Sequence, residues 1–293
     1  MEAAPKQRVA ILTGGASGIG RSLSEELARR GVEVVVADRQ GDLAAEVVEK
    51  IRGSGGRAQG VEVDVRSAES MQGLVDSTLA RTGRLDYFFN NAGIGVGGPI
   101  EAYSAADWQD VLDVNLRGVI HGIQAAYPAM VRQKFGHLVN TASLAGLVAG
   151  GGGGSYTATK FAVVGLSKAL RIEAAYHNVR VSVLCPGVVR TAILQGGKYG
   201  RLNMQGVSQE FIDRFWEKLR PMDPHVFAHR ALDAIAKNRA LIVLPRFWLL
   251  AWYFDRFFPD LSLWLATRSF RKMRLELEAG GAAPAAADKE LRA

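Results

Sequence analysis

The clearest chemical signal in this sequence is a tyrosine and a lysine placed four positions apart, Tyr156 and Lys160. On an α-helix, residues with this spacing lie on one face. A phenol with an ordinary pKa of about 10 is a poor acid or base near neutrality, but a nearby ammonium favours the phenolate and lowers that pKa. The pair therefore indicates a general acid and base, able to give a proton to a carbonyl oxygen or to take one from a hydroxyl.

Two more polar residues, Ser143 and Asn115, extend this candidate site. We expect Ser143 at the end of a strand, where its hydroxyl would hydrogen-bond the reacting oxygen and set its orientation. Taken singly, these residues have ordinary interpretations, because a helical Tyr or Lys is usually at the surface or half-buried and Ser143 could simply end a strand. Only the combination indicates catalysis.

A glycine-rich turn, Thr13-Gly-Gly-Ala-Ser-Gly-Ile-Gly20, follows the first expected strand and opens a helix. Because Gly14, Gly18 and Gly20 carry no side chain, backbone amides there can approach a pyrophosphate, and the N-terminus of the helix favours the anion. Glycine in a strand-to-helix turn can also serve only to supply a positive φ. Its place after the first strand favours a dinucleotide site.

An acidic residue stands near the spacing that such sites use for the adenosine ribose. Asp38 lies 18 residues beyond Gly20, at the end of the second expected strand. A carboxylate there hydrogen-bonds the ribose hydroxyls and repels a 2′-phosphate, so we expect NAD rather than NADP. Asp38 could instead cap the next helix, and Arg39 could bind a phosphate or stack on adenine, which keeps NADP as the alternative. Oxidised nicotinamide would add its positive charge to that of Lys160 in lowering the pKa of Tyr156.

The rest of the chain predicts the elements that position these residues. Short apolar, β-branched runs alternate with longer helical patterns, which is typical of a parallel sheet with crossover helices. We expect an α/β fold: a doubly wound, parallel, seven-stranded Rossmann sheet in a single domain with a C-terminal helical extension. Strands are expected at 8–12, 32–37, 58–62, 85–89, 137–141, 179–184 and 240–244, and helices at 18–30, 42–52, 68–82, 107–132, 155–176 and 224–238.

This pattern divides the chain into three parts. Residues 1–244 form the dinucleotide-binding and catalytic domain, within which 190–222 are expected to be a mobile substrate lid. Residues 245–278 form the C-terminal extension. The tail 279–293 is rich in Ala, Gly and charge, and we expect it to be disordered.

Taken together, these pieces resemble the short-chain dehydrogenase/reductase family. They follow the family's order over residues 8–244, and the 13-residue step from Ser143 to Tyr156 is also similar to the family's. The matching pieces are the Thr-Gly-x-x-x-Gly-Ile-Gly turn of 13–20, Asp64, Asn90-Asn91-Ala92-Gly93, Asn115, Ser143, the Tyr-x-x-x-Lys motif of 156–160, Pro186-Gly187 and Thr191.

The resemblance implies a role for each position. Tyr156 would be the catalytic acid and base, Lys160 would lower its pKa and bind the nicotinamide ribose, and Ser143 would orient the substrate. Asn115 would anchor a water that links Lys160 to solvent as a proton relay. The implied cofactor-binding residues, with no metal site, are Gly14, Ser17, Gly18, Ile19, Gly20, Asp38, Arg39, Asp64, Val65, Asn91, Ala92, Gly93, Tyr156, Lys160, Pro186, Gly187, Val189 and Thr191.

Two further expectations come from the same resemblance. The family implies a homo-oligomer, a tetramer or a dimer, in which helices 107–132 and 155–176 pack against their symmetry mates. One departure from the family is a run of five glycines at 150–154, directly before the active-site helix. We therefore expect an open or mobile pocket wall there.

The function that we expect is hydride transfer between NAD and a secondary alcohol or ketone. The alternatives are an NADP-dependent carbonyl reductase and a dinucleotide-sensing regulator, which would typically lack the Tyr and Lys pair. A sugar-nucleotide epimerase usually carries a longer substrate domain than the 49 residues after Leu244. Apolar lid residues favour a lipophilic substrate such as a steroid, a terpenoid or a long-chain alcohol, although a lid also needs apolar residues to dock: Ile193, Leu194, Tyr199, Leu202, Met204, Phe211, Phe215 and Trp216.

Composition limits the cellular context. The single cysteine, Cys185, excludes an internal disulfide, and no nucleic-acid recognition motif accompanies the formal charge of +7. The polar residues 1–8 run straight into an apolar strand, which leaves no room for a signal peptide, and no run of about 18 uncharged apolar residues occurs. We expect a cytoplasmic protein.

The C-terminal extension is unusually aromatic and basic. Eight of the 18 residues from 247 to 264 are aromatic, and residues 246–274 hold six basic against two acidic side chains. So much ring surface requires a partner, which could be a neighbouring subunit, the substrate pocket or a membrane interface. We expect two short helices, split at Pro259, that extend the pocket or the subunit interface. A weak, peripheral affinity for anionic lipid through 245–274 is a secondary expectation.

Overall fold

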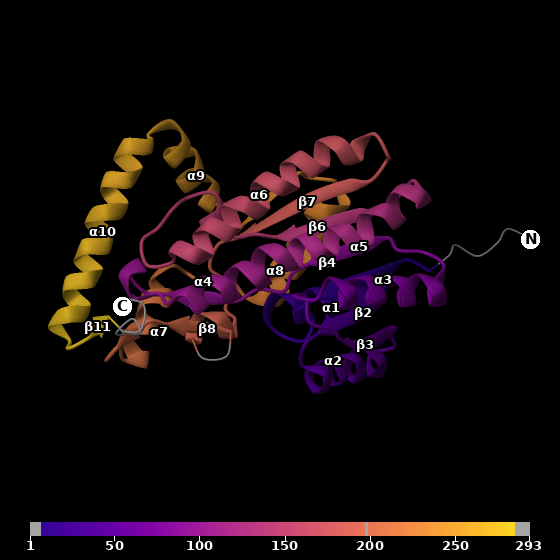
Figure 1. Cartoon of the computed structure of the whole chain (residues 1–293), viewed down its shortest axis with the longest axis horizontal. Helices are drawn as coiled ribbons and strands as arrows, with labels where there is room; N and C mark the ends of the chain where they lie inside the picture. Colours follow the sequence, from indigo (N-terminus) through magenta and orange to yellow (C-terminus); the bar gives the residue numbers. More distant parts are fainter. Residues whose placement is uncertain (1–6, 197–198, 285–293) are drawn as a thin grey trace, which may run out of the picture.

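The computed structural model describes residues 7–196 and 199–284, and it contains seven parallel strands in one sheet with helices on both faces (Figure 1). The strand order is β10-β7-β6-β4-β1-β2-β3, so the connections leave β1 in opposite directions, as in sheets that bind ligands beyond their carboxyl ends. This confirms the predicted α/β, doubly wound, single-domain fold. The strands are β1 (Val9–Thr13), β2 (Glu33–Asp38), β3 (Ala58–Glu62), β4 (Tyr87–Asn90), β6 (His137–Thr141), β7 (Arg180–Pro186) and β10 (Leu241–Leu244).

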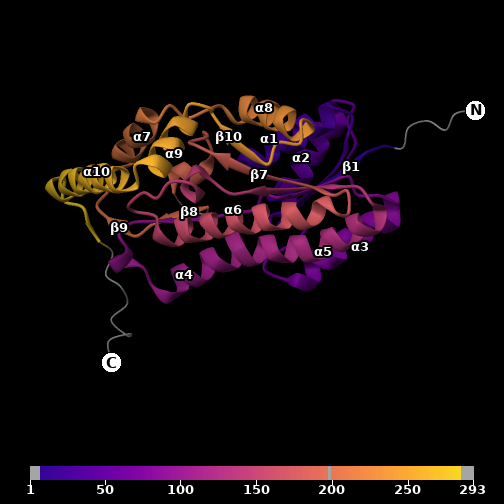
Figure 2. The same ribbon diagram turned by 90° about the horizontal axis from the view of Figure 1, so that it is seen from above.

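Helices cover both faces of the sheet (Figure 2), and each face buries an apolar cluster. Every residue of β1 and of β6 is buried, because a parallel strand with helices on both faces has no solvent side. One face is covered by α1 (Gly18–Arg29), α2 (Gly41–Gly53) and α8 (Pro224–Ala236), and the other by α3 (Ala68–Thr82), α5 (Gly118–Gln133) and α6 (Gly154–Ala175).

The helix expected at 107–132 is interrupted by one wide turn. It consists of α4 (Ala105–Leu112), the π-helical turn η2 (Asp113–Arg117) and α5. A capping box between Ser104 and Asp107 starts it earlier than predicted. The wide turn contains Asn115, which is fully buried, and π-turns of this kind occur frequently at functional sites.

The lid region contains short elements that are tied to other parts of the chain. It includes η4 (Ala192–Gln195), β8 (Gly200–Leu202), β9 (Met204–Gln205) and α7 (Gln209–Lys218). Strand β8 pairs with β5 (Gly95–Gly97), and β9 pairs with β11 (Ala283–Pro284). Single turns η1 (Ile100–Ala102) and η3 (Leu144–Gly146) follow β5 and β6.

The C-terminal extension forms two helices at one end of the molecule (Figure 1). They are α9 (Trp248–Phe257) and α10 (Pro259–Ala279), and Pro259 occupies the first turn of α10, where its missing N–H leaves no bond unmade. Helix α10 has 21 residues and is longer than predicted. The tail 279–293 was expected to be disordered, but its first residues are ordered, because Ala279 ends α10 and β11 pairs with β9. Residues 285–293 of that tail lie outside the described part.

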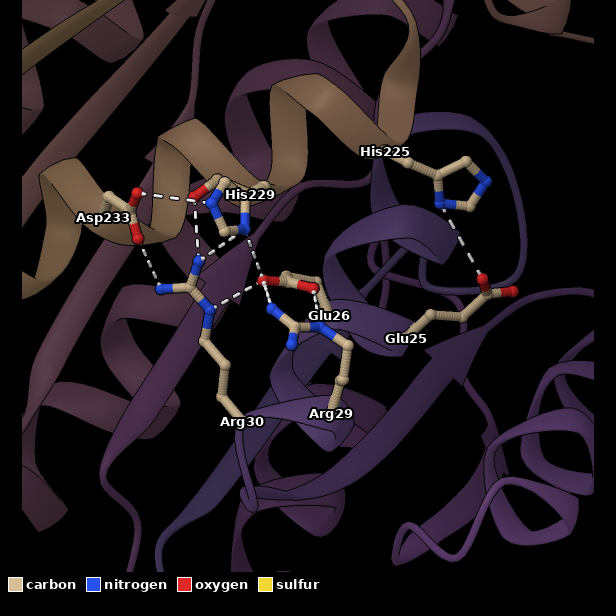
Figure 3. Close-up of polar contacts among 7 residues, drawn as sticks. All are labelled: Glu25, Glu26, Arg29, Arg30, His225, His229 and Asp233. Atoms are coloured by element: carbon tan, nitrogen blue, oxygen red, sulfur yellow. Dashed lines mark hydrogen bonds and ion pairs between the residues drawn. The ribbon is translucent and has the colours of Figure 1, made fainter.

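A network of charged side chains joins α1 to α8 (Figure 3). The carboxylate of Glu26 accepts hydrogen bonds from Arg29 at 2.6 Å and from Arg30 at 2.8 Å, and it lies 2.9 Å from Nδ1 of His229 on α8. Arg30 also pairs with Asp233 of α8 at 2.8 Å. The hydrogen bond from Arg29 is the main reason why the pKa of Glu26 falls to about 2.

We predict that this network stabilises the protein only above acidic pH. The folded-state pKa of Glu26 lies below its ordinary value of 4.5, so its contribution is complete above pH 4.5 and is lost as the pH falls toward 2. Glu26→Gln should lower the free energy of unfolding at pH 7 by about 1 to 2 kcal/mol, and the difference from wild type should shrink on acidification. Denaturant unfolding at several pH values measures this effect, and Glu49→Gln, which removes an exposed pair with Arg52, is the control. A deficit that stays constant down to pH 3 would contradict the prediction.

Candidate active site

A single cavity of about 1020 Å³ lies at the carboxyl ends of the strands and continues beneath the lid. Every residue that the sequence assigned to catalysis or cofactor binding lines it, except Asn115. The wall includes the glycine turn after β1, the end of β2, the loop after β4, the ends of β6 and β7, and the first turns of α6. Nucleotide-binding and catalytic candidates therefore share one continuous space.

The glycine turn is shaped by close backbone contacts. Gly14 and Gly18 have φ values of +63° and +51°, and a Cβ added at Gly20 would lie 1.9 Å from the carbonyl oxygen of Gly14. Ser17 precedes α1, yet its side chain does not cap the helix, and the first turn contains no acidic residue. The amides at this N-terminus fit a phosphate group, because Ser17 does not bond them and no acidic side chain of the first turn repels an anion.

Two carboxylates near the expected ribose site have different hydrogen-bond partners. Asp38 is 8 % exposed and accepts hydrogen bonds from the amides of Ala16 and Gln40, both at 3.1 Å. These bonds fix its side chain at the end of β2 against the cavity wall. The carboxylate of Asp64 is paired with Arg66 at 2.6 Å, and this hydrogen bond lowers the pKa of Asp64. Asp38 forms no ion pair among the described residues, and its assignment to the ribose stays a prediction.

Lys160 is a buried ammonium, 3 % exposed. Its Nζ donates to the carbonyl oxygen of Thr141 at 2.9 Å and lies 5.3 Å from the centroid of the Tyr156 ring. Burial lowers the pKa of Lys160 to about 8, because the charged form loses its hydration. Tyr156 and Lys160 do share one face of α6, as their spacing predicted.

The pKa of Tyr156 differs from the expectation. The sequence predicted a lowered pKa, whereas burial raises it in this structure, with the hydrogen bond between Tyr156 and Ser143 acting in the opposite direction. The prediction counted two positive charges, those of Lys160 and of oxidised nicotinamide. Lys160 alone does not outweigh the cost of removing a phenolate from water.

Hydrogen bonds connect Lys160 to the glycine turn. The hydroxyl of Thr141 donates to the side-chain oxygen of Asn91 at 3.2 Å. The side-chain nitrogen of Asn91 donates to the carbonyls of Thr13 and Gly14 at 3.2 and 3.3 Å. The Thr13 hydroxyl accepts hydrogen bonds from the backbone amides of Asn91 and Ala92. This role of Thr13 was missed, although its place at the end of β1 was visible in the motif.

Asn115 lies behind the cavity wall rather than in it. Its side chain accepts from the amide of Ile94 and donates to the carbonyl of Ile94, both at 2.9 Å. A Cβ at Gly93 would lie 3.3 Å from Oδ1 of Asn115 and 3.5 Å from Nζ of Lys160. Asn115 thus holds the loop that separates it from Lys160, and its role in a water relay stays a prediction.

Two other titratable groups, on strands of the sheet, do not change protonation state near neutral pH. Burial raises the pKa of Cys185 to about 12, so its thiol stays protonated. Burial lowers the pKa of His137 to about 3, and its Nε2 lies 2.8 Å from the Ser182 hydroxyl. Neither group competes with Tyr156 as an acid or base.

The substrate side of the cavity is walled by the lid and by the C-terminal helices. All eight apolar lid residues named from the sequence line the cavity. Trp248 of α9 and Phe270, Met273 and Leu277 of α10 line it as well, so the C-terminal helices extend the pocket, which was one of the two expected outcomes, although the three α10 residues were not predicted individually. Their signal was the spacing of 270, 273 and 277, which places three apolar side chains on one helical face. The indole Nε1 of Trp248 is buried with no hydrogen-bond partner in the described chain.

The run of five glycines allows α10 to approach the active-site helix. A Cβ added at Gly151 would lie 2.5 Å from Cδ2 of Phe270, whereas one added at Gly153 would meet nothing within 4 Å. Similarly, a Cβ at Gly187 would lie 2.3 Å from the Trp248 ring. Phe270 therefore approaches this wall at Gly151, although Gly150 and Gly151 remain exposed, and the expected open or mobile wall stays a prediction.

The family model described as short chain dehydrogenase matches residues 8–198. The chain belongs to the short-chain dehydrogenase family. The 3beta-hydroxysteroid dehydrogenase 2 of Eggerthella lenta is 37 % identical over 188 residues, which cover 64 % of this chain and 72 % of that protein.

Two solved members of the family are similar over the fold. A short chain dehydrogenase/reductase from Burkholderia phymatum, in complex with NAD, is 32 % identical with a TM-score of 0.77, covering 87 % of this chain and 95 % of that one. A metagenomic short-chain oxidoreductase in complex with NADP is 35 % identical with a TM-score of 0.59, covering 62 % and 83 %. This short-chain dehydrogenase is thus an oxidoreductase of a family whose members bind NAD or NADP.

We predict that Tyr156→Phe lowers kcat by at least roughly 100-fold, because it removes the proton that a general acid or base transfers. Dinucleotide binding, measured as a shift in melting temperature, should be retained, since the ring and Lys160 remain. Tyr199→Phe is the matched control, because it removes a phenol from the same cavity but from the lid. Near wild-type kcat in Tyr156→Phe would exclude the catalytic assignment.

We also predict that Gly151→Ala displaces α10. The new methyl would meet Phe270, which should lower the free energy of unfolding by about 1 to 3 kcal/mol. Gly153→Ala, in the same loop but in open space, should have little effect. The double variant Gly151→Ala with Phe270→Ala should recover part of the loss in thermal unfolding experiments, and equal effects of the two single variants would contradict the contact.

Proposed function

We propose that this short-chain dehydrogenase transfers hydride between NAD and a lipophilic secondary alcohol or its ketone. The observation that carries this proposal is the shared cavity, in which Tyr156 and Lys160 lie between the glycine turn and an apolar wall. When bound there, NAD would supply the hydride acceptor for alcohol oxidation. Tyr156 would take the hydroxyl proton, Ser143 would hold the substrate oxygen, and Lys160 would favour the phenolate through its charge.

The apolar wall supports a bulky substrate. Lid residues such as Leu202, Met204 and Phe215 face the same space as Phe270 and Met273 of α10. A hydroxyl on a large ring system or a long chain could then reach Tyr156 while its carbon skeleton leaves water. The steroid dehydrogenase of Eggerthella lenta, by its name, acts on a substrate of this kind.

The choice of NAD depends on Asp38. Its carboxylate is fixed by two backbone amides, so it cannot easily turn away from a 2′-phosphate, and the repulsion would persist. Arg39 is exposed and also lines the cavity, which favours an NADP-dependent carbonyl reductase as the second candidate. A substrate panel assayed with both dinucleotides tests the two, by the absorbance of the reduced cofactor.

We predict that Asp38→Ser narrows the preference for NAD over NADP. The ratio of kcat/KM values should fall roughly 10- to 100-fold, because a charged hydrogen bond to the ribose is lost and the repulsion of a phosphate is removed. Asp42→Ser removes the same charge from the first turn of α2 and should leave the ratio unchanged. A wild-type enzyme with the higher kcat/KM for NADP would overturn the NAD proposal.

A further inference from the structure

Nine large apolar side chains are exposed along α9 and the first two turns of α10. We call this set of residues the apolar corner. Phe257 at 71 % and Leu250 at 75 % are its most exposed members. Figures 1 and 2 place α10 at one end of the molecule, where it runs along the outside of the fold. The members of the apolar corner are Phe247, Leu250, Tyr253, Phe257, Phe258, Leu261, Leu263, Trp264 and Leu265.

Exposed basic side chains alternate along the sequence with the members of the apolar corner. Arg246, Arg256 and Arg271 are exposed and form no ion pair among the described residues. Arg268 lies over the Trp264 ring, 5.7 Å from its centroid. Aromatic rings beside arginines are the composition that suits the boundary between acyl chains and anionic headgroups.

The acidic side chains do not cancel this charge. Asp255 accepts a hydrogen bond from Ser262 at 2.8 Å, which ties its carboxylate across the turn between the two helices. Asp260 is the other acidic residue between 246 and 274. Lys272 and Arg274 pair with glutamates outside this stretch, but the four arginines at 246, 256, 268 and 271 still outnumber the two aspartates. The apolar corner therefore carries a net positive charge.

We propose that the apolar corner docks on the surface of an anionic lipid bilayer. No helix of the described chain is long and apolar enough to span a membrane, so the contact is peripheral. The corner enters the interface with its rings, and the arginines bind lipid phosphates. Because the inner sides of α9 and α10 wall the cavity with Trp248 and Phe270, a docked bilayer lies beside that cavity.

A second copy of the chain is a less suitable occupant. Two-fold packing of the apolar corner on itself would bring the arginines of one copy against those of the other, which costs electrostatic energy. An anionic surface instead complements the same charges. The charge pattern therefore decides between the two ways of covering this apolar surface.

The experiment measures flotation of the full chain with vesicles, without dinucleotide or substrate, so that it stands apart from the proposed function. Phosphatidylcholine vesicles with phosphatidylglycerol should bind the protein at low salt and release it at high salt, and pure phosphatidylcholine vesicles should bind little. Failure to bind the anionic vesicles at low salt, or equal binding to both kinds, overturns the proposal.

Paired variants locate the contact. Arg256→Gln with Arg271→Gln should weaken binding to anionic vesicles roughly 30-fold, whereas Arg57→Gln with Arg230→Gln, which removes two exposed arginines elsewhere, should not. Equal losses in the two double variants would show an effect of net charge alone and overturn the assignment to the corner.

A second pair tests the apolar part. Phe257→Gln with Leu261→Gln should reduce binding several-fold, because each buried ring or branched chain adds to the affinity. Phe135→Gln with Val226→Gln, which changes two exposed apolar residues outside the C-terminal helices and outside the helices expected at a subunit interface, is the control. Light scattering is run on the same samples. If the corner variant breaks an assembly and leaves vesicle binding intact, the corner is a contact between copies and the lipid proposal fails.

Discussion

The burial of the Lys160 ammonium is the interaction on which the candidate site depends. An ammonium removed from water must be held by a strong acceptor, and the carbonyl oxygen of Thr141 is the acceptor that the structure provides. That contact fixes α6 against the end of β6. The hydrogen bonds through Thr141 and Asn91 then continue to the glycine turn. Catalytic and nucleotide-binding parts are therefore positioned by one chain of polar contacts.

Glycine has two distinct purposes in this chain. In the turn after β1 it supplies positive φ at Gly14 and Gly18 and lets the backbone fold back on itself at Gly20. At Gly151 and Gly187 it makes room for aromatic rings of the C-terminal helices. The second purpose explains how Phe270 can approach a loop whose Gly150 and Gly151 remain exposed. A missing side chain provides space, and a distant segment can occupy that space.

The sequence predicted the sheet and the local motifs well, because both depend on nearby residues. Strands buried on two faces read as apolar runs, and the four-residue step of Tyr156 and Lys160 needs only one helix. The contacts that were missed join distant segments. Phe270 of α10 meets Gly151 of the loop before α6, and β11 near the C-terminus pairs with β9 of the lid region. The raised pKa of Tyr156 was missed for a similar reason, since burial is a property of the whole site.

Part of the cavity wall comes from α10, so residues outside the sheet help to shape the cavity. Phe270, Met273 and Leu277 belong to the last long helix, and none of them is part of the apolar clusters that pack against the sheet. Substitutions there can reshape the space for a substrate while the nucleotide cradle and the folding core stay unchanged. These three wall residues and the core of the sheet thus lie in different stretches of the chain, so substitutions in one need not disturb the other.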